Sequence, residues 1–232
     1  DFRRSRGLGD VYKRQILNIE TSSTNCSVSL SNKSELVDCV EADSENYSHS
    51  EKLHLFIEEI LNKNKLKFTQ LKACAISRGP GSYTGLRIGL SAAKGLCFGL
   101  DIPLISISSL KIIANAVKFR GLIIPTMDAR RDEVYSCVFD SKLNVKIEEK
   151  PEIINNNSYL KIAQKNKILI VGDGQIKCKK IIDPNKNISF DNKILRPSSQ
   201  YMCDLAYEKF KTGDFEDLAY FEPKYLKEFK TH

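Results

Sequence analysis

The sequence predicts an α/β protein that contains two tandem copies of a βββαβ unit with flanking helices. The order strand, strand, strand, helix, strand, turn occurs twice, starting near residue 16 and again near residue 122. In both copies the last strand ends in a glycine-containing turn, at 79–81 and at 172–174. The chain has 232 residues, 41% of them hydrophobic and 28% charged, which is enough for one large domain or two small ones with real cores.

The first copy begins with a meander. Residues 16–20 form an apolar strand, residues 26–30 alternate as a second strand, and residues 35–40 follow as a third. A helix that starts at Ser48 then carries one apolar stripe. The short apolar run 73–77 is typical of a buried strand.

The glycine turn 79–81 and the helix after it are the most unusual stretch of the chain. Pro80 has a fixed φ and lies between two permissive glycines, and Ser82 or Thr84 can cap the helix. Each interior glycine costs about 1 kcal/mol of helix propensity. The glycines inside this helix are Gly85, Gly89, Gly95 and Gly99. Close approach of another backbone would offset that cost, so the stretch is either a ligand cradle or a contact surface.

The second copy has the same order of elements. A strand at 103–107 and a helix capped by Ser108 or Ser109 lead into it. Its predicted strands are 122–127, 134–139, 145–149 and 168–171. Its predicted helices lie near 157–164 and at 198–211. A tandem duplication with a cleft between its halves is the layout of the actin-like ATPase (ASKHA) superfold. We expect an N-terminal subdomain at 16–108, a C-terminal subdomain at 109–215, and a tail at 216–232 that packs back on the first subdomain.

Residues 1–15 are set apart from the rest. They lack apolar periodicity and are similar to translated adapter or vector sequence, so we expect a non-native or disordered tail. Of the net charge of +7, these residues contribute five basic side chains against two acidic ones. No signal peptide or membrane-length apolar run is present, which predicts a cytoplasmic protein. The seven scattered cysteines predict reduced core thiols.

Nucleotide binding is disfavoured by the turns after the first strand of each copy. Neither 21–25 nor 129–133 contains a glycine, whereas a phosphate loop needs close backbone approach. We therefore predict no cofactor and no metal. The remaining candidates for nucleotide or cleft contacts are Glu20, Asp128, Arg130, Gly172, Asp173 and Gly174. A salt bridge between Asp128 and Arg130, and a tight strand-to-helix turn at 172–174, are the structural alternatives.

Histidine does not support a metal site either. His49 and His54 are five residues apart, so on a helix their side chains point about 140° away from each other. Solvated or capping histidines are the better interpretation. No histidine stands at a spacing from Ser77, Ser82 or Cys74 that would indicate nucleophilic catalysis.

Four segments together resemble the TsaB (YeaZ) family: residues 78–95, residues 16–22, the run 128–135 and residues 223–226, in order over nearly all of 16–229. The string RGPGSYTGLRIG is the most specific of them. The resemblance implies the actin-like superfold and a bacterial cytosolic subunit required for threonylcarbamoyladenosine at position 37 of tRNAs that read codons beginning with A. Glu20 stands where relatives commonly have Asp, which puts metal binding further in doubt.

The same resemblance implies the partners. TsaD carries the metal and transfers the threonylcarbamoyl group, TsaB is a non-catalytic subunit that pairs with it, and the ATPase TsaE joins the assembly. tRNA is then contacted indirectly, and no membrane is involved. Without TsaD, a second copy can take its place as a homodimer.

The predicted interface follows from the small residues of the helix. Gly85, Gly89 and Ala92 or Ala93 recur at three- and four-residue spacing, which forms a flat stripe suited to a four-helix bundle with the partner. Arg78 and Arg87 can contact phosphate or RNA, or else form an ion pair and lie on an exposed helix face. The full predicted interface is Arg78, Gly79, Pro80, Gly81, Ser82, Tyr83, Thr84, Gly85, Arg87, Ile88, Gly89, Ala92 and Ala93.

Two other functions stay open. An independent ATP-dependent transferase or metallopeptidase of the same superfold is the main alternative, and the missing loop glycines and ligands speak against it. A direct tRNA-binding module is the second, and the modest charge outside residues 1–15 gives it little support.

Overall fold

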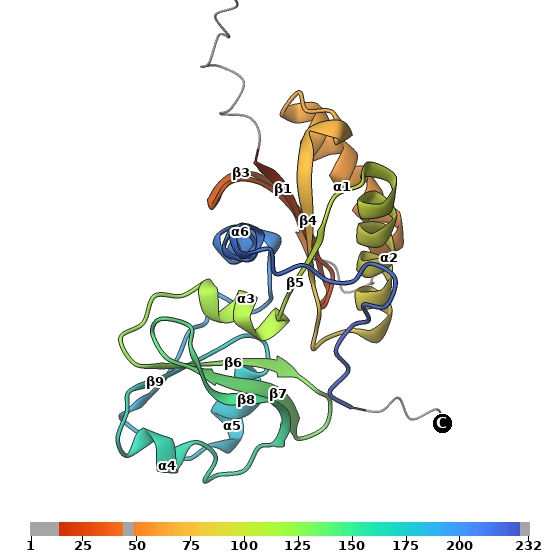
Figure 1. Ribbon diagram of the computed structural model, residues 1–232. Coiled ribbons are helices and arrows are strands. Elements are labelled where there is room, and N and C mark those ends of the chain that lie inside the picture. The colour runs from red at the N-terminus through yellow and green to blue at the C-terminus, as the bar shows by residue number, and fades with distance from the viewer. Residues whose placement is uncertain (1–13, 44–48, 228–232) are drawn as a thin grey trace, which may run out of the picture.

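The computed structural model describes residues 14–43 and 49–227, which form two five-stranded sheets with helices on both faces of each (Figure 1). Most of the predicted N-terminal tail, the predicted helix start at Ser48 and residues 228–232 lie outside the described residues. The two sheets correspond to the two predicted copies.

The first sheet has the order β3-β2-β1-β4-β5. Its strands are β1 (Gln15–Glu20), β2 (Asn25–Asn32), β3 (Glu35–Asp43), β4 (Leu71–Ser77) and β5 (Leu104–Ile107). The first three strands form the predicted antiparallel meander, and β4 pairs in parallel with β1, with Leu17 beside Cys74. β5 extends the parallel part. All six residues of β1 are buried because helices cover both faces of this central strand.

The second sheet has the order β10-β9-β6-β7-β8. Its strands are β6 (Leu122–Asp128), β7 (Glu133–Phe139), β8 (Val145–Ile153), β9 (Ile168–Val171) and β10 (Ile188–Phe190). Taken from the opposite edge, this order is that of the first sheet, with β6 in the place of β1 and β9 in the place of β4. β10, the counterpart of β5, is not among the predicted strands.

Two pairs of helices cover the outer faces. α1 (His49–Lys63) and α2 (Tyr83–Leu100) pack on the first sheet, and α4 (Leu160–Ala163) and α5 (Gln175–Ile181) on the second. The short 3-10 turn η1 (Phe68–Gln70) leads into β4. As predicted, Ser82 caps α2: its Oγ accepts from the N–H of Gly85 at 3.3 Å. Within the described residues, no helix combines the length and apolar character needed to cross a membrane.

Two helices lie between the sheets, and each packs on the sheet of the other half (Figure 1). α3 (Ser109–Asn115) follows β5, is capped by Ser108, and places Leu110 and Ile113 against β6, β7 and β9. The 3-10 turn η2 (Ser199–Met202) and α6 (Cys203–Thr212) end the second copy, and Met202 and Ala206 pack on β1, β4 and β5. The repeated unit is therefore βββαβαβα, longer than predicted.

The exchange of helices crosses the predicted boundary between the two subdomains. The segment 199–212 was expected in the second subdomain, but its apolar face belongs to a core with Ile16, Ala73 and Ile105 of the first sheet. A helix is positioned by the apolar surface that it can cover, and β1, β4 and β5 leave one face open for it.

Residues 216–227 form an irregular strap along the first half. The N–H of Glu216 donates to Leu104 O at 2.9 Å, and Leu218 and Phe221 pack on the first core. Farther on, the N–H of Lys224 donates to Arg78 O at 2.8 Å, and its Nζ lies 3.0 Å from Glu149 Oε2 in β8. The strap therefore joins the two halves.

Candidate functional site

The glycine turn 79–81 packs tightly against the turn between β1 and β2. The N–H of Ser82 donates to Ser22 O at 2.7 Å. A Cβ added at Gly81 would lie 2.2 Å from that same Ser22 O, and one at Gly79, where φ is +100°, would lie 2.8 Å from Lys224 O. These glycines admit the chain's own backbone at close range. The space that a ligand cradle would need is occupied by the chain itself.

The first two turns of α2 continue this contact. The hydroxyl of Thr21 donates to Gly85 O at 2.8 Å, and a Cβ at Gly85 would lie 2.1 Å from Thr21 O. A Cβ at Gly89 would lie 2.2 Å from Thr21 Oγ1, and Ala93 is fully buried in the first core. The prediction that Gly85, Gly89 and Ala93 contact a partner is wrong: these residues form the face of α2 that packs on its own sheet.

Glu20, at the end of β1, is fully buried beneath this joint. One carboxylate oxygen accepts from the N–H of Ser22. Burial raises the pKa of Glu20 to about 7, against the opposing effect of hydrogen bonds from Ser22, Ser77 and Thr21. With no exposed surface, Glu20 cannot reach a nucleotide in this conformation. Glu20, which was predicted to contact a nucleotide or the cleft, is an internal carboxyl group.

His49 was missed as part of this joint. It is the first residue of α1 and is 1% exposed, and its Nε2–H donates to Ser23 O at 2.8 Å. Burial lowers its pKa. The interpretation as a solvated residue is wrong for His49, whereas His54 is exposed. Nothing in the local sequence distinguishes the two, because the turn that buries His49 lies more than twenty residues earlier in the chain.

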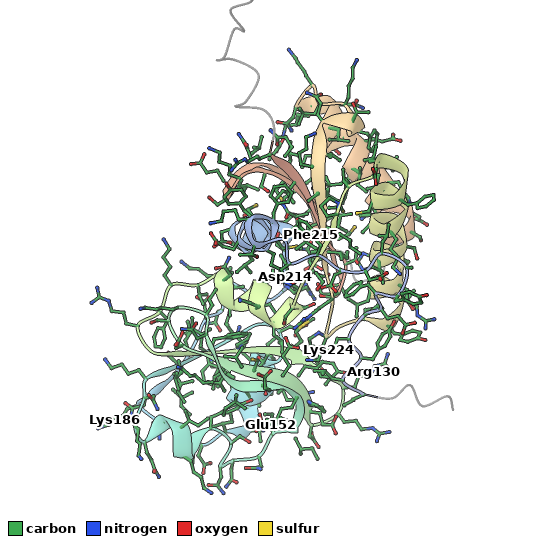
Figure 2. All side chains as sticks on the ribbon, viewed as in Figure 1. Arg130, Glu152, Lys186, Asp214, Phe215 and Lys224 are labelled. Atoms are coloured by element: carbon green, nitrogen blue, oxygen red, sulfur yellow. The ribbon has the colours of Figure 1, made fainter. Side chains whose placement is uncertain are left out.

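The corresponding turn of the second half is exposed and charged. Lys177 Nζ lies 3.1 Å from Asp128 Oδ1, and the N–H of Asp128 donates to Asp173 Oδ1 at 2.8 Å. Burial raises the pKa of Asp173. Asp128 does form a salt bridge, but its partner is Lys177. The expected side-chain pair with Arg130 does not form, since Arg130 contributes only its backbone N–H to Asp128 and is exposed (Figure 2).

The glycines of this half also serve a tight turn. A Cβ at Gly172 would lie 2.1 Å from Thr126 O, and one at Gly174 would lie 2.9 Å from Thr126 Cβ. Both therefore allow the start of α5 to approach β6, as the strand-to-helix alternative predicts. In the part of the chain that the structure describes, no group of three or more His, Cys, Asp and Glu side chains could hold a metal ion.

The outer surface of α1 and α2 contains a shallow groove of about 590 Å³. Its lining residues are Ser50 and His54 from α1, and Arg87, Ile88, Ser91, Ala92, Gly95 and Leu96 from α2. A Cβ added at Gly95 or Gly99 meets nothing within 4 Å. Leu55 and Phe98, on the same two helices, are 61% and 84% exposed. The predicted interface residues Arg87, Ile88 and Ala92 lie here, together with Gly95.

The start of α2 is covered by the strap. The ring of Tyr83 lies 4.9 Å from that of Tyr225, and the Arg87 guanidinium is 4.1 Å above the Tyr83 ring. Arg87 Nε also donates to Tyr225 OH at 3.2 Å. Arg78 is half-buried, 3.9 Å from Glu149. An ion pair for Arg78 and an exposed helix face for Arg87 therefore describe the positions of the two arginines. Thr84 is the exposed residue between them.

Comparison with known proteins identifies the family. The family model described as "TsaD: tRNA N6-adenosine threonylcarbamoyltransferase" matches residues 44–230. A Haemophilus influenzae protein named tRNA threonylcarbamoyladenosine biosynthesis protein TsaB is 30% identical over 91% of this chain and 93% of its own length. The chain belongs to the TsaB (YeaZ) family. The Escherichia coli TsaB protein is 28% identical over 92% of this chain and 94% of its own length.

A solved structure described as YeaZ from Pseudomonas aeruginosa has the same fold as this chain. It superposes with a TM-score of 0.78 at 22% identity, covering 92% of this chain and all of the other. The predicted resemblance and the actin-like ATPase superfold, with two tandem copies of an α/β unit, are confirmed. The comparisons do not assign the α1–α2 groove.

Proposed function

We propose that this chain is a non-catalytic subunit that binds TsaD in the formation of threonylcarbamoyladenosine at position 37 of tRNAs reading codons that begin with A. The names of the H. influenzae and E. coli relatives support the pathway. Support for TsaD as the partner comes from the TsaD family model, because its match includes both α1 and α2. Two chains with related helix pairs can pack them face to face.

The observation that carries the proposal is the outward groove between α1 and α2. Small side chains and glycine let a partner helix approach closely, and Ile88, Ala92 and Leu96 supply apolar contact. Leu55 and Phe98 are large apolar side chains left in solvent on the same helices. In the proposed complex, α1 and α2 form a four-helix bundle with the equivalent pair of TsaD, TsaE joins this assembly, and a second copy occupies the face when TsaD is absent.

The closed joint of the first half supports a role without catalysis. Thr21 and Ser22 occupy the space in front of the glycine turn, and Glu20 is buried behind them. A nucleotide phosphate could enter only by displacing hydrogen bonds to Ser22 O and from Thr21 Oγ1. TsaD would then supply the transfer chemistry.

The test is Gly95→Leu, measured by calorimetric titration with TsaD. The new side chain has open space and a better helix propensity than glycine, so the fold is kept, but it projects into the groove. We expect at least a tenfold loss of affinity, about 1.4 kcal/mol. Gly99→Leu, one turn farther along the same face but outside the groove, should cost less affinity than Gly95→Leu. Unchanged affinity of the Gly95 variant would contradict the proposed interface.

Reconstitution of the tRNA modification tests the function itself. TsaD, TsaE and the enzyme that supplies the threonylcarbamoyl donor are assayed with and without this chain, and product is quantified by mass spectrometry. We expect modification to require the chain, and to fall with Gly95→Leu in step with TsaD affinity. Full modification in its absence would refute the scaffold role.

A further inference from the structure

Basic side chains gather at one end of the second sheet. β6, β9 and β10 are parallel neighbours, so the loops that precede them meet at the same edge. The N–H of Leu122 donates to Lys167 O at 2.9 Å, and the N–H of Ile168 donates to Asn187 O at 2.7 Å, which holds the three loops together. β7 is antiparallel to β6, so the β7–β8 turn ends here too.

These four loops carry six cations, which we term the basic edge: Lys118, Arg120, Lys142, Lys165, Lys167 and Lys186. All six are exposed, and Lys186 lies at the outer rim of the second half in Figure 2. Within residues 14–43 and 49–227, none of the six forms an ion pair. Asp140, in the turn that carries Lys142, is already paired with Lys146 at 3.1 Å.

The basic edge also has a shape. A groove of about 520 Å³ lies between the loop before β6 and the β7–β8 turn. Lys118, Arg120 and Lys142 line it together with Phe119, which is partly buried against the core of the second half. Cations that follow a nucleic-acid backbone, combined with an aromatic ring able to stack on a base, are the features of surfaces that bind single-stranded or looped RNA.

The charge is specific to this half of the duplication. Residues 116–197 contain sixteen Lys and Arg against ten Asp and Glu, whereas residues 15–115 contain ten of each. A general enrichment in lysine would raise the net charge of both halves alike. The excess in one half creates a positive potential that attracts a polyanion.

We propose that the basic edge binds the phosphate backbone of tRNA directly. This inference rests on the proposed function, which brings the chain to a tRNA substrate, and it adds a direct contact between this chain and the tRNA. From β10 to β7 the edge spans about 15 Å, since neighbouring strands lie about 4.8 Å apart. That width lets cations from separate loops reach different phosphates, and the groove beside Phe119 accepts an unpaired base. A binding site for an acidic protein would not require the aromatic groove.

The test is the triple variant Lys118→Glu/Arg120→Glu/Lys167→Glu in complex with TsaD. Binding of fluorescently labelled, unmodified tRNA is measured by anisotropy across a salt series. We expect at least tenfold weaker binding at low salt, and a slope of log affinity against log salt that is lower in magnitude by roughly 2 to 3, since about one counterion is released per lost phosphate contact. Lys165→Glu/Lys186→Glu serves as a second variant if the triple variant does not fold.

The matched control is Lys33→Glu/Lys67→Glu/Lys72→Glu. Lys33 lies in the β2–β3 turn and Lys67 precedes β4, the positions in the first half that correspond to Lys142 and Lys167. We expect tRNA affinity within twofold of the unaltered complex. Unchanged affinity and slope in the basic-edge variants overturn the proposal, and so does a loss of tRNA modification with unchanged tRNA affinity, which would assign the edge to an acidic protein.

Calorimetric titration with TsaD separates this inference from the proposed function. The basic edge lies on the second half, away from α1 and α2, so its variants should bind TsaD as the unaltered chain does. Loss of tRNA binding with intact TsaD binding supports the inference. Absence of TsaD binding by the unaltered chain refutes the scaffold function. In that case, titration of the chain alone with tRNA still tests whether the basic edge binds tRNA.

Discussion

The two halves of the molecule share one joint and differ in what they present to solvent. In each, a glycine after the fourth strand lets a turn approach the end of the first strand, Gly81 against Ser22 and Gly172 against Thr126. In the first half the β1–β2 turn is buried in this joint, and an eighteen-residue helix with a groove follows. In the second half the β6–β7 turn is exposed, and the following helix has seven residues. The joint is common to both halves, whereas their outer surfaces differ.

The largest effect is expected where the joint is tightest. Gly85→Ala places a Cβ 2.1 Å from Thr21 O, so backbone must shift, and we expect a loss of about 3 kcal/mol or more of unfolding free energy. Gly95→Ala, on the opposite face of α2, meets only open space and should raise stability by about 0.5–1 kcal/mol. Denaturant unfolding measures both. Similar changes in the two variants would remove the distinction between an inner and an outer glycine face.

Glu20 allows a smaller, pH-dependent test of the buried turn. Its pKa in the folded state, about 7, is above the ordinary 4.5, so the stability it contributes is complete below pH 4.5 and is lost as pH rises through 7. At pH 8 the ionised, buried carboxylate should therefore cost about 3 kcal/mol relative to acid pH. Glu20→Gln should be more stable than the unaltered chain at pH 8, with the gain shrinking toward pH 5. Parallel stability curves for the two proteins would show that the turn opens to solvent.

The smallest effect is expected at the exposed turn of the second half. Asp128 pairs with Lys177 at the surface, and Lys177 Nζ keeps its bond to Glu133 O at 2.8 Å when the carboxylate is removed. Asp128→Ala should therefore change stability by less than about 1 kcal/mol. ATP turnover by the purified chain tests the enzymatic alternative. Turnover that this substitution abolishes would make the second half a catalytic site and reverse the comparison.

Much of the fold could be predicted because most strands are long enough to show apolar periodicity. The two meanders and the parallel strands after them follow from that pattern, as does the cap at Ser82. β10 was missed because three residues carry almost no periodicity. The packing of α6 on the first sheet could not be predicted for another reason: an apolar stripe predicts that a helix is covered, but does not indicate which sheet covers it.

The candidate site was predicted less well, because both faces of α2 have small residues at helical spacing. Gly85, Gly89 and Ala93 form one set, and Ser91, Gly95 and Gly99 form another. Only the position of Thr21 decides which set is internal, and that contact joins residues 64 positions apart. The basic edge could not be predicted for a similar reason. Its loops are separated in sequence, and the net charge of the chain averages over both halves.

The exchange of helices has a consequence during synthesis on the ribosome. β1, β4 and β5 are complete at residue 107, but α6, which covers their inner face, is complete only at residue 212. At translation rates of about 5–20 residues per second, that face is exposed for roughly 5–20 s. Because the covering helix comes last, a nascent chain that stalls in the second half presents an unfinished apolar sheet to chaperones and proteases.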